Sequence, residues 1–276
     1  SLYCWGSNAA GRLGDGTTTS SSTPVNVDLG LGRYAVAISA GNYHTCAILD
    51  NGSLKCWGNN PYGNLGDGST SESSTPVSVD LGTGRTAIAI SLGNIHSCAI
   101  LDDNSLKCWG YGRNGELGRG SYLDSSTPVL VSLPSSRTAV AVSAGSHHTC
   151  AILDNLSVQC WGENEDGQLG IGSFGSGTNT EETTPVYVNL SGNLAAVSER
   201  DFDEDGTLNI FDTHMKRTSA VSTGRFHTCA ILEGGSPYCW GDNTYGQLGN
   251  TSLAWPITTS HTPLAVDIPS GRYATA

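Results

Sequence analysis

The tripeptide Cys-Trp-Gly recurs along the chain, and this recurrence constrains the fold more than any other feature of the sequence. Successive copies are separated by 52, 52, 52 and 79 residues, and they begin at Cys4, Cys56, Cys108, Cys160 and Cys239. A second cysteine lies ten residues before each of the last four copies, at Cys46, Cys98, Cys150 and Cys229. A fixed period of this length indicates one supersecondary unit used repeatedly, with 27 extra residues in the last interval.

Each period repeats the same order of short segments. Cys-Trp-Gly is followed by a G-x-L-G loop, a variable Ser/Thr-rich loop, a Thr-Pro segment with alternating apolar residues, a run of small apolar residues, and finally His-Thr/Ser-Cys-Ala-Ile-Leu. Four runs of four to six residues, bounded by Gly, Pro or Asn-Gly, predict four short strands per period. A four-stranded unit that repeats about every 50 residues is typical of a β-propeller blade, so we expect an all-β fold.

These repeats resemble the regulator of chromosome condensation family, whose blades carry a similar G-x-L-G loop and a similar period. The resemblance implies a propeller that usually has seven blades, of which this chain holds material for about five. We therefore expect residues 1–276 to form a single propeller segment, part of a seven-bladed ring in a longer protein, because Cys4 lacks a partner ten positions upstream. A smaller ring that closes between the two termini is the alternative.

The paired cysteines predict cross-strand disulfides. A three-residue turn over Asp50 to Gly52 places Leu49 opposite Ser53 and brings Cys46 opposite Cys56, where directly opposed Cβ atoms are close enough to be bridged. The predicted bridges are Cys46 to Cys56, Cys98 to Cys108, Cys150 to Cys160, and Cys229 to Cys239. Free cysteines that pack as small apolar residues are the alternative, whereas zinc is disfavoured because C-x₉-C is not a ligand spacing. Disulfides indicate an oxidising compartment, so we expect a secreted or cell-surface protein.

The tryptophans of Cys-Trp-Gly and the histidines before Thr/Ser-Cys recur at equivalent points of each period. Copies spread around a ring cannot meet in one active site. We therefore expect them to pack and hydrogen-bond within each blade, at Trp5, Trp57, Trp109, Trp161, Trp240, His44, His96, His148 and His227.

The extra residues of the last interval include a predicted calcium loop within residues 191–216. Oxygen-bearing side chains at loop positions 1, 3, 5, 9 and 12, with Gly at position 6, match the pattern that supplies Ca²⁺ with hard oxygen ligands. The segment resembles EF-hand and dockerin loops, which implies side-chain ligands and one backbone carbonyl at Asp201, Asp203, Asp205, Thr207 (carbonyl), Asn209 and Asp212. Position 12 is Asp, whereas most EF-hands have Glu there. The alternative to a calcium site is an acidic loop that is simply solvated. A bound ion would have a structural role, because it would cancel the repulsion between the carboxylates.

The loop after G-x-L-G differs in every period, while the residues that form the expected strands are nearly constant. Three of these loops carry a large aromatic residue, at Tyr122, Phe174 and Trp255. Rotation about a propeller axis brings equivalent loops to one face, and aromatic residues on a rigid scaffold are typical of a binding surface. Drift in an unconstrained loop is the alternative interpretation. Three further tyrosines near G-x-L-G, at positions 62, 111 and 245, are expected to pack.

Composition and motifs narrow the function further. The formal net charge of −12 and the lack of any basic cluster disfavour nucleic-acid binding, and no apolar run is long enough to span a membrane. No nucleophile elbow, phosphate loop or zinc-protease motif is present, so we expect no enzyme activity. The sequence favours an extracellular, non-catalytic module that binds protein or glycan. A structural building block that self-assembles is the second hypothesis. The family that the repeats resemble includes nucleotide exchange factors and secreted β-lactamase inhibitors, so this resemblance implies a third hypothesis, inhibition of an extracellular enzyme.

Overall fold

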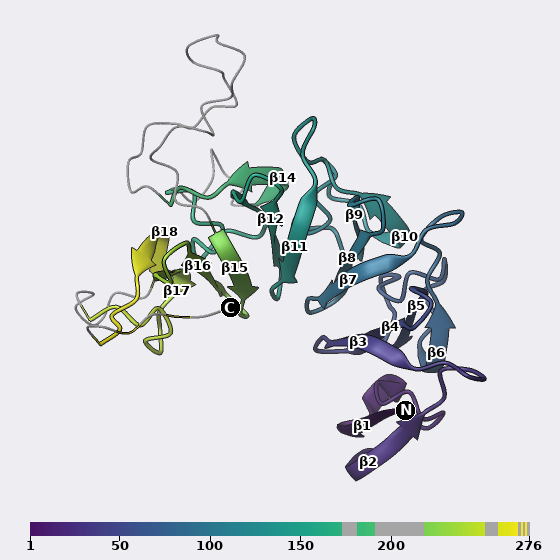
Figure 1. Cartoon of the computed structure of the whole chain (residues 1–276). Coiled ribbons are helices and arrows are strands. Elements are labelled where there is room, and N and C mark those ends of the chain that lie inside the picture. Colours follow the sequence, from purple (N-terminus) through teal and green to yellow (C-terminus); the bar gives the residue numbers. More distant parts are fainter. Residues whose placement is uncertain (173–180, 191–217, 252–258, 270–271, 273, 275–276) are drawn as a thin grey trace.

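The computed structural model describes residues 1–172, 181–190, 218–251, 259–269, 272 and 274. These residues form five antiparallel sheets that follow one another along an arc (Figure 1). The all-β propeller architecture predicted from the repeat is confirmed. The sheets at the two ends of the arc lie apart, so the described residues do not close a five-bladed ring (Figure 1).

Blade 1 has two strands and blades 2 to 5 have four each, paired in chain order. Blade 1 contains β1 (Leu2–Gly6) and β2 (Ser21–Val27), with the short 3-10 helix η1 (Ala9–Gly11) between them. Blade 2 contains β3 (Ala35–Ala40), β4 (His44–Leu49), β5 (Leu54–Gly58) and β6 (Ser73–Ser78). Blade 3 contains β7 (Ala87–Leu92), β8 (His96–Leu101), β9 (Leu106–Gly110) and β10 (Ser125–Leu130). Blade 4 contains β11 (Ala139–Ala144), β12 (His148–Leu153), β13 (Val158–Gly162) and β14 (Glu182–Tyr187). Blade 5 contains β15 (Thr218–Thr223), β16 (His227–Leu232), β17 (Pro237–Asp242) and β18 (Thr259–Ala265).

The core lies between the blades. Successive side chains of a strand point to opposite faces of its sheet. In β4, Cys46 and Ile48 join a cluster with blade 3, whereas Ala47 and Leu49 join a cluster with blade 1. Both faces of β4 are therefore covered, which explains why all six of its residues are buried and why it lacks an apolar–polar alternation.

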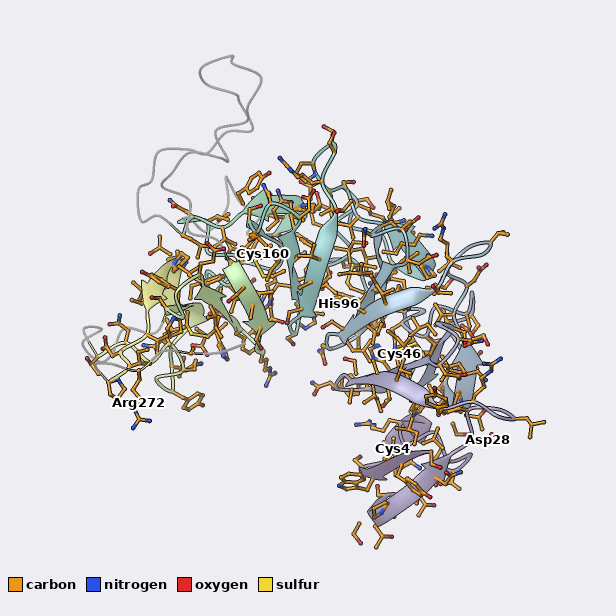
Figure 2. The ribbon with its side chains drawn as sticks, in the orientation of Figure 1. Cys4, Asp28, Cys46, His96, Cys160 and Arg272 are labelled. Atoms are coloured by element: carbon orange, nitrogen blue, oxygen red, sulfur yellow. A yellow bond between two sulfur atoms is a disulfide. The ribbon has the colours of Figure 1, made fainter. Side chains whose placement is uncertain are left out.

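The second and third strands of each complete blade are joined by the predicted disulfide. Cys46 pairs directly with Cys56 across a turn in which Gly52 has φ +75°, as the three-residue loop requires. Figure 2 shows Cys46 and Cys160 within their sheets and Cys4 in the two-stranded blade at one end. All four predicted bridges are present: Cys46–Cys56, Cys98–Cys108, Cys150–Cys160 and Cys229–Cys239. Cys4 carries a free thiol, and partial burial raises its pKa.

Candidate functional site

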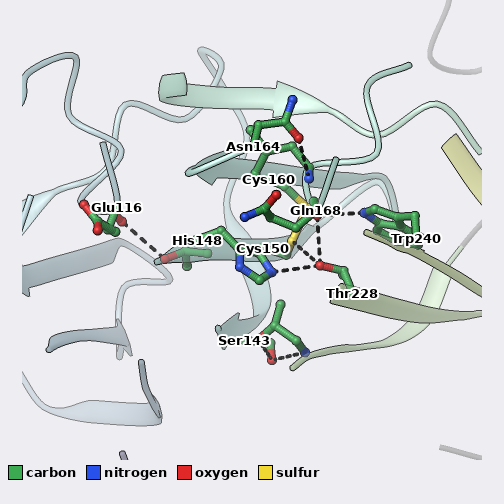
Figure 3. The surroundings of a disulfide bond; sticks show 12 residues. Glu116, Ser143, His148, Cys150, Cys160, Asn164, Gln168, Thr228 and Trp240 are labelled. Carbon is green, nitrogen blue, oxygen red and sulfur yellow. Dashed lines mark hydrogen bonds between the residues drawn. A yellow bond between two sulfur atoms is a disulfide. The ribbon is translucent and has the colours of Figure 1, made fainter. Parts of the chain in front are cut away.

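Neighbouring blades are joined at a backbone carbonyl of the G-x-L-G loop. At the junction of blades 4 and 5, the carbonyl of Gln168 accepts a hydrogen bond from Trp240 Nε1 at 2.8 Å and another from Thr228 Oγ1 at 3.0 Å (Figure 3). His148 Nε2 lies 2.9 Å from Thr228 Oγ1. Because the single hydroxyl proton is donated to Gln168, the histidine must donate its Nε2 proton to the hydroxyl.

The same carbonyl junction recurs between the other blades. In each case the acceptor belongs to one blade and the tryptophan and hydroxyl belong to the next. The groups are Arg12 with Trp57 and Thr45, Asn64 with Trp109 and Ser97, and Glu116 with Trp161 and Thr149. His44 and His96 bond the hydroxyl of the following blade in the same way. The expectation of hydrogen bonds within each blade is therefore wrong for seven of these residues, whose side chains join neighbouring blades: Trp57, Trp109, Trp161, Trp240, His44, His96 and His148. Trp5, in blade 1, is 63 % exposed.

Burial keeps the junction histidines neutral. It lowers the pKa of His44, His96 and His148 to about 3, since no charged partner replaces the lost water. In each ring Nδ1 has no hydrogen-bond partner. These histidines act as hydrogen-bond donors in the framework.

Three sets of loops meet at one end of the sheets, which we call the loop face: the turns between first and second strands, the G-x-L-G loops, and the variable loops. Backbone bonds such as Tyr111 N to Ile95 O hold the G-x-L-G loop against the neighbouring turn. The Asn60 side chain donates to the Ser69 and Ser71 carbonyls and so ties the variable loop to the G-x-L-G loop. For the described variable loops, those of blades 1 to 3, this arrangement agrees with the expectation that such loops share a face.

An aromatic and charged group, which we call the tyrosine cluster, lies on the loop face where blades 2, 3 and 4 meet. The rings of Tyr62 and Tyr111 pack edge to face with centroids 4.9 Å apart, and Tyr111 lies 6.0 Å from His147. The Arg113 guanidinium is 5.7 Å from the Tyr62 ring and 5.9 Å from the Tyr111 ring. Its Nη2 also lies 3.1 Å from Asp124 Oδ2, which belongs to the variable loop of blade 3. The cluster thus connects the G-x-L-G loops to a variable loop.

Beneath this cluster, Glu116 is hydrogen-bonded to His147. The carboxylate is fully buried and lies 3.2 Å from His147 Nδ1. Burial raises the pKa of Glu116, although the hydrogen bond from His147 opposes this shift. The same hydrogen bond raises the pKa of His147, against the opposing effect of burial. The pair is therefore a titratable group set just below the loop face.

Glu116 is the second residue of its G-x-L-G loop, and His147 directly precedes the recurrent histidine of the next blade. The residues at these two positions differ at each blade junction. At the first junction Arg12 lies 5.5 Å from the centroid of the Tyr43 ring, whereas at the third junction Glu116 is hydrogen-bonded to His147. The second and fourth junctions have Asn64 with Ile95 and Gln168 with Phe226. Sequence reasoning missed these positions because it compared only loops after G-x-L-G. The residue before the recurrent histidine varies just as strongly, and this signal would have identified them.

Of the predicted binding residues, Tyr122 lies on the loop face and is 42 % exposed. It neighbours Leu123, 68 % exposed, and lies two residues before Asp124. Phe174, Trp255 and the predicted calcium ligands at 201–212 lie outside the described residues. Tyr62 and Tyr111 pack as expected, whereas Tyr245 is 91 % exposed, against expectation.

A shallow depression of about 340 Å³ lies where the first turns of blades 2 to 5 come together. Its wall is formed mainly by small residues, with the side chains of Asn42, Asn94, Ser146 and Arg225 among its polar groups. In the described part of the chain, no three His, Cys, Asp or Glu side chains are placed to hold a metal ion. No helix of sufficient length and apolarity to cross a membrane occurs in that part either.

Comparison with known proteins identifies relatives over most of the chain. A family model for the RCC1-like domain matches residues 1–273. The chain is 29 % identical to the ultraviolet-B receptor UVR8 of Arabidopsis thaliana over 248 residues, which cover 90 % of this chain and 50 % of the receptor. It is also 29 % identical over 280 residues to the human E3 ubiquitin-protein ligase HERC2, covering 90 % of this chain and 6 % of the ligase. The chain thus spans half or less of these relatives.

Solved structures share the fold. Human WBSCR16 superimposes with a TM-score of 0.74 at 20 % identity, covering 97 % of this chain and 62 % of that protein. Prp20p from Saccharomyces cerevisiae, described with its binding to Gsp1p and histones, also has a TM-score of 0.74 at 20 % identity, with 95 % and 60 % covered. Both likenesses concern the propeller architecture.

Proposed function

The chain belongs to the RCC1-like domain family, and we propose that it is an extracellular, non-catalytic module that binds a protein through its loop face. RCC1-like propellers are typically protein-interaction modules. The tyrosine cluster is the observation that carries the proposal. Tyrosine and arginine are enriched among residues that dominate binding energy, and here they are held in place by ring packing and by the ion pair with Asp124.

The extracellular setting is supported by the four disulfides, because such bonds persist in oxidising compartments. The proposed surface also includes Tyr122 and, from the sequence, the aromatic residues of two further variable loops, Phe174 and Trp255. Calcium binding at Asp201, Asp203, Asp205, Thr207, Asn209 and Asp212 stays a prediction. Calorimetry with Ca²⁺ on the wild type and on Asp205→Ala tests it, and identical traces would refute it.

The binding proposal can be tested with a photo-crosslinking amino acid placed at Tyr111 on the loop face or at Tyr34. The side chain of Tyr34 is 54 % exposed and lies at the opposite end of the sheets. With extracellular proteins of the source organism, we expect a discrete adduct only from the loop-face position. The Arg113→Glu variant should lose this adduct.

Arg85→Glu is the matched control, because Arg85 also forms surface ion pairs, with Asp102 and Asp103, but at the opposite end. Equal adduct yields from both ends, or no effect of Arg113→Glu, would contradict the proposal. Binding of the same variants to a glycan array distinguishes a carbohydrate ligand, and light scattering on the isolated protein distinguishes a self-assembling building block.

A further inference from the structure

Four side chains form a directed line of hydrogen bonds that begins on the loop face and crosses three blades. Asn42 Nδ2 of blade 2 donates to Asn94 Oδ1 of blade 3 at 2.9 Å. Asn94 Nδ2 lies 3.4 Å from His147 Nε2 of blade 4, and His147 Nδ1 lies 3.2 Å from the buried Glu116 carboxylate. The two asparagines occupy equivalent positions in neighbouring blades, 52 residues apart.

The direction of these bonds fixes the state of the imidazole. Asn94 presents its NH₂ group to Nε2, so that nitrogen must accept and carries no proton, while Nδ1 carries a proton and donates it to Glu116. The hydrogen bonds therefore all run in one direction, because each side chain donates to the next one from Asn42 to Glu116.

A proton added to His147 reverses the part of this line that runs through the two asparagines, while Nδ1 still donates to Glu116. Protonated imidazole is a donor at both nitrogens, so Nε2–H would face the NH₂ group of Asn94 with two donors opposed. If the Asn94 amide turns by about 180°, its oxygen accepts from Nε2–H. Its NH₂ group then faces Asn42, whose amide must turn as well. We propose that Asn42, Asn94 and His147 form a proton-controlled relay that couples three blades and reverses the donors and acceptors along one wall of the depression.

The charged surroundings of His147 set the pH at which the relay changes. Carboxylates face it from two sides, Glu116 in the loop after β9 and Glu163 in the loop after β13, and both raise its pKa. Arg225, in the turn between β15 and β16, lowers its pKa, as does partial burial. The remaining titratable neighbours are Tyr111, whose ring packs on the imidazole, and the neutral histidines His96 and His148. The net effect is a raised pKa, so the change occurs above the ordinary value of 6.5.

The relay does not depend on the proposed function, because it can be observed in the isolated protein. The experiment follows the imidazole ¹⁵N signals of His147 and the side-chain amide signals of Asn42 by NMR during a pH titration. We expect the Asn42 amide signals to shift with the same midpoint as His147, although Asn42 does not contact the imidazole. A pH-independent Asn42 amide in the wild type would overturn the proposal, as would an Asn42 shift with a different midpoint.

Two variants separate the relay from a general effect of charge. In Asn94→Leu, which removes the central amide, His147 should still titrate while the Asn42 amide no longer responds. In His147→Phe the Asn42 response should also disappear. An Asn42 response that persists in Asn94→Leu would show that it senses His147 through space and would overturn the relay. Near-ultraviolet circular dichroism of each variant establishes that the tryptophan environments are unchanged.

Discussion

The histidines of the blade junctions show how burial sets the chemistry of a single residue. His44, His96 and His148 are buried, donate through Nε2 and have no charged partner, so their pKa is lowered to about 3. In the unfolded chain each returns to its ordinary value near 6.5. Between these values the unfolded state binds more protons than the folded state, so the free energy of unfolding must fall as the pH decreases below 6.5.

We therefore expect the protein to lose stability steeply in mild acid. Each junction histidine contributes a slope of up to about 1.4 kcal/mol per pH unit in this range. Urea unfolding measured from pH 7.5 to pH 4.5 on the wild type and on His96→Gln checks this, because the glutamine amide can still donate to Thr149 without titrating. The variant should show the shallower pH dependence, and equal slopes would contradict the assignment.

The contribution of His147 to the free energy of unfolding depends on pH with the opposite sign. Its pKa is raised in the folded protein by the hydrogen bond to Glu116, so its contribution to stability is present below the unfolded value and is lost as the pH rises through the folded value. Two histidines adjacent in sequence, His147 and His148, therefore respond to pH in opposite directions. Their surroundings differ because the side chain of one lies beside the carboxylate and the other lies within the blade junction.

At the scale of the element, the G-x-L-G loop depends on the close approach of its last glycine to the next blade. Gly118 has φ +63°, and an added Cβ would lie 2.8 Å from Trp161 Nε1. Gly120, two residues on, has φ +79°, but the nearest atom to an added Cβ is 3.7 Å away. The two glycines share the strained backbone region and differ in the available space.

Gly118→Ala should accordingly destabilise the protein by more than Gly120→Ala. The alanine at 120 costs about 1–2 kcal/mol for its left-handed backbone, and the alanine at 118 adds displacement of the buried indole. Chemical unfolding of both variants, followed by tryptophan fluorescence, makes the comparison. Equal losses of stability would show that the loop does not require contact with Trp161.

The sequence predicted the elements well where local rules decide them. The turn over Asp50–Gly52 and the ten-residue spacing were sufficient to pair Cys46 with Cys56, because a hairpin brings together residues that are near in sequence. The junction bonds could not be predicted in this way. His148 and Thr228 are 80 residues apart, and which hydroxyl meets which imidazole depends on how one sheet packs on the next.

The tyrosine cluster was missed for a related reason. Tyr62 and Tyr111 occupy comparable loops of neighbouring blades, and only the packing of blade 2 on blade 3 brings their rings to 4.9 Å. Tyr122 was identified because aromatic residues are conspicuous in a Ser/Thr-rich loop. Loop composition was therefore sufficient to identify Tyr122. The contacts of Arg113 with Tyr62 and Tyr111 could be identified only from the three-dimensional structure.

At the scale of the whole molecule, the four disulfides pair eight of the nine cysteines and leave Cys4 as a free thiol. Alkylation of the unreduced, unfolded protein followed by peptide mapping should label Cys4 and none of the eight paired cysteines. Reduction before alkylation should label all nine cysteines of the chain. Label on any of the eight without reduction would contradict the pairing, and with it the support for an oxidising compartment.

Among the described strands, the extensive contacts between blades are those between neighbours in the chain, as in other repeat architectures, so the arc is held together by a series of similar junctions. The acceptor at every junction is a main-chain oxygen, an atom that all twenty amino acids supply. Arginine, asparagine, glutamate and glutamine occupy that position in successive blades without loss of the bonds from tryptophan and the hydroxyl. Duplicated blades can thus diverge in the side chain of the residue that supplies the acceptor, while the hydrogen bonds to its main-chain oxygen are inherited intact.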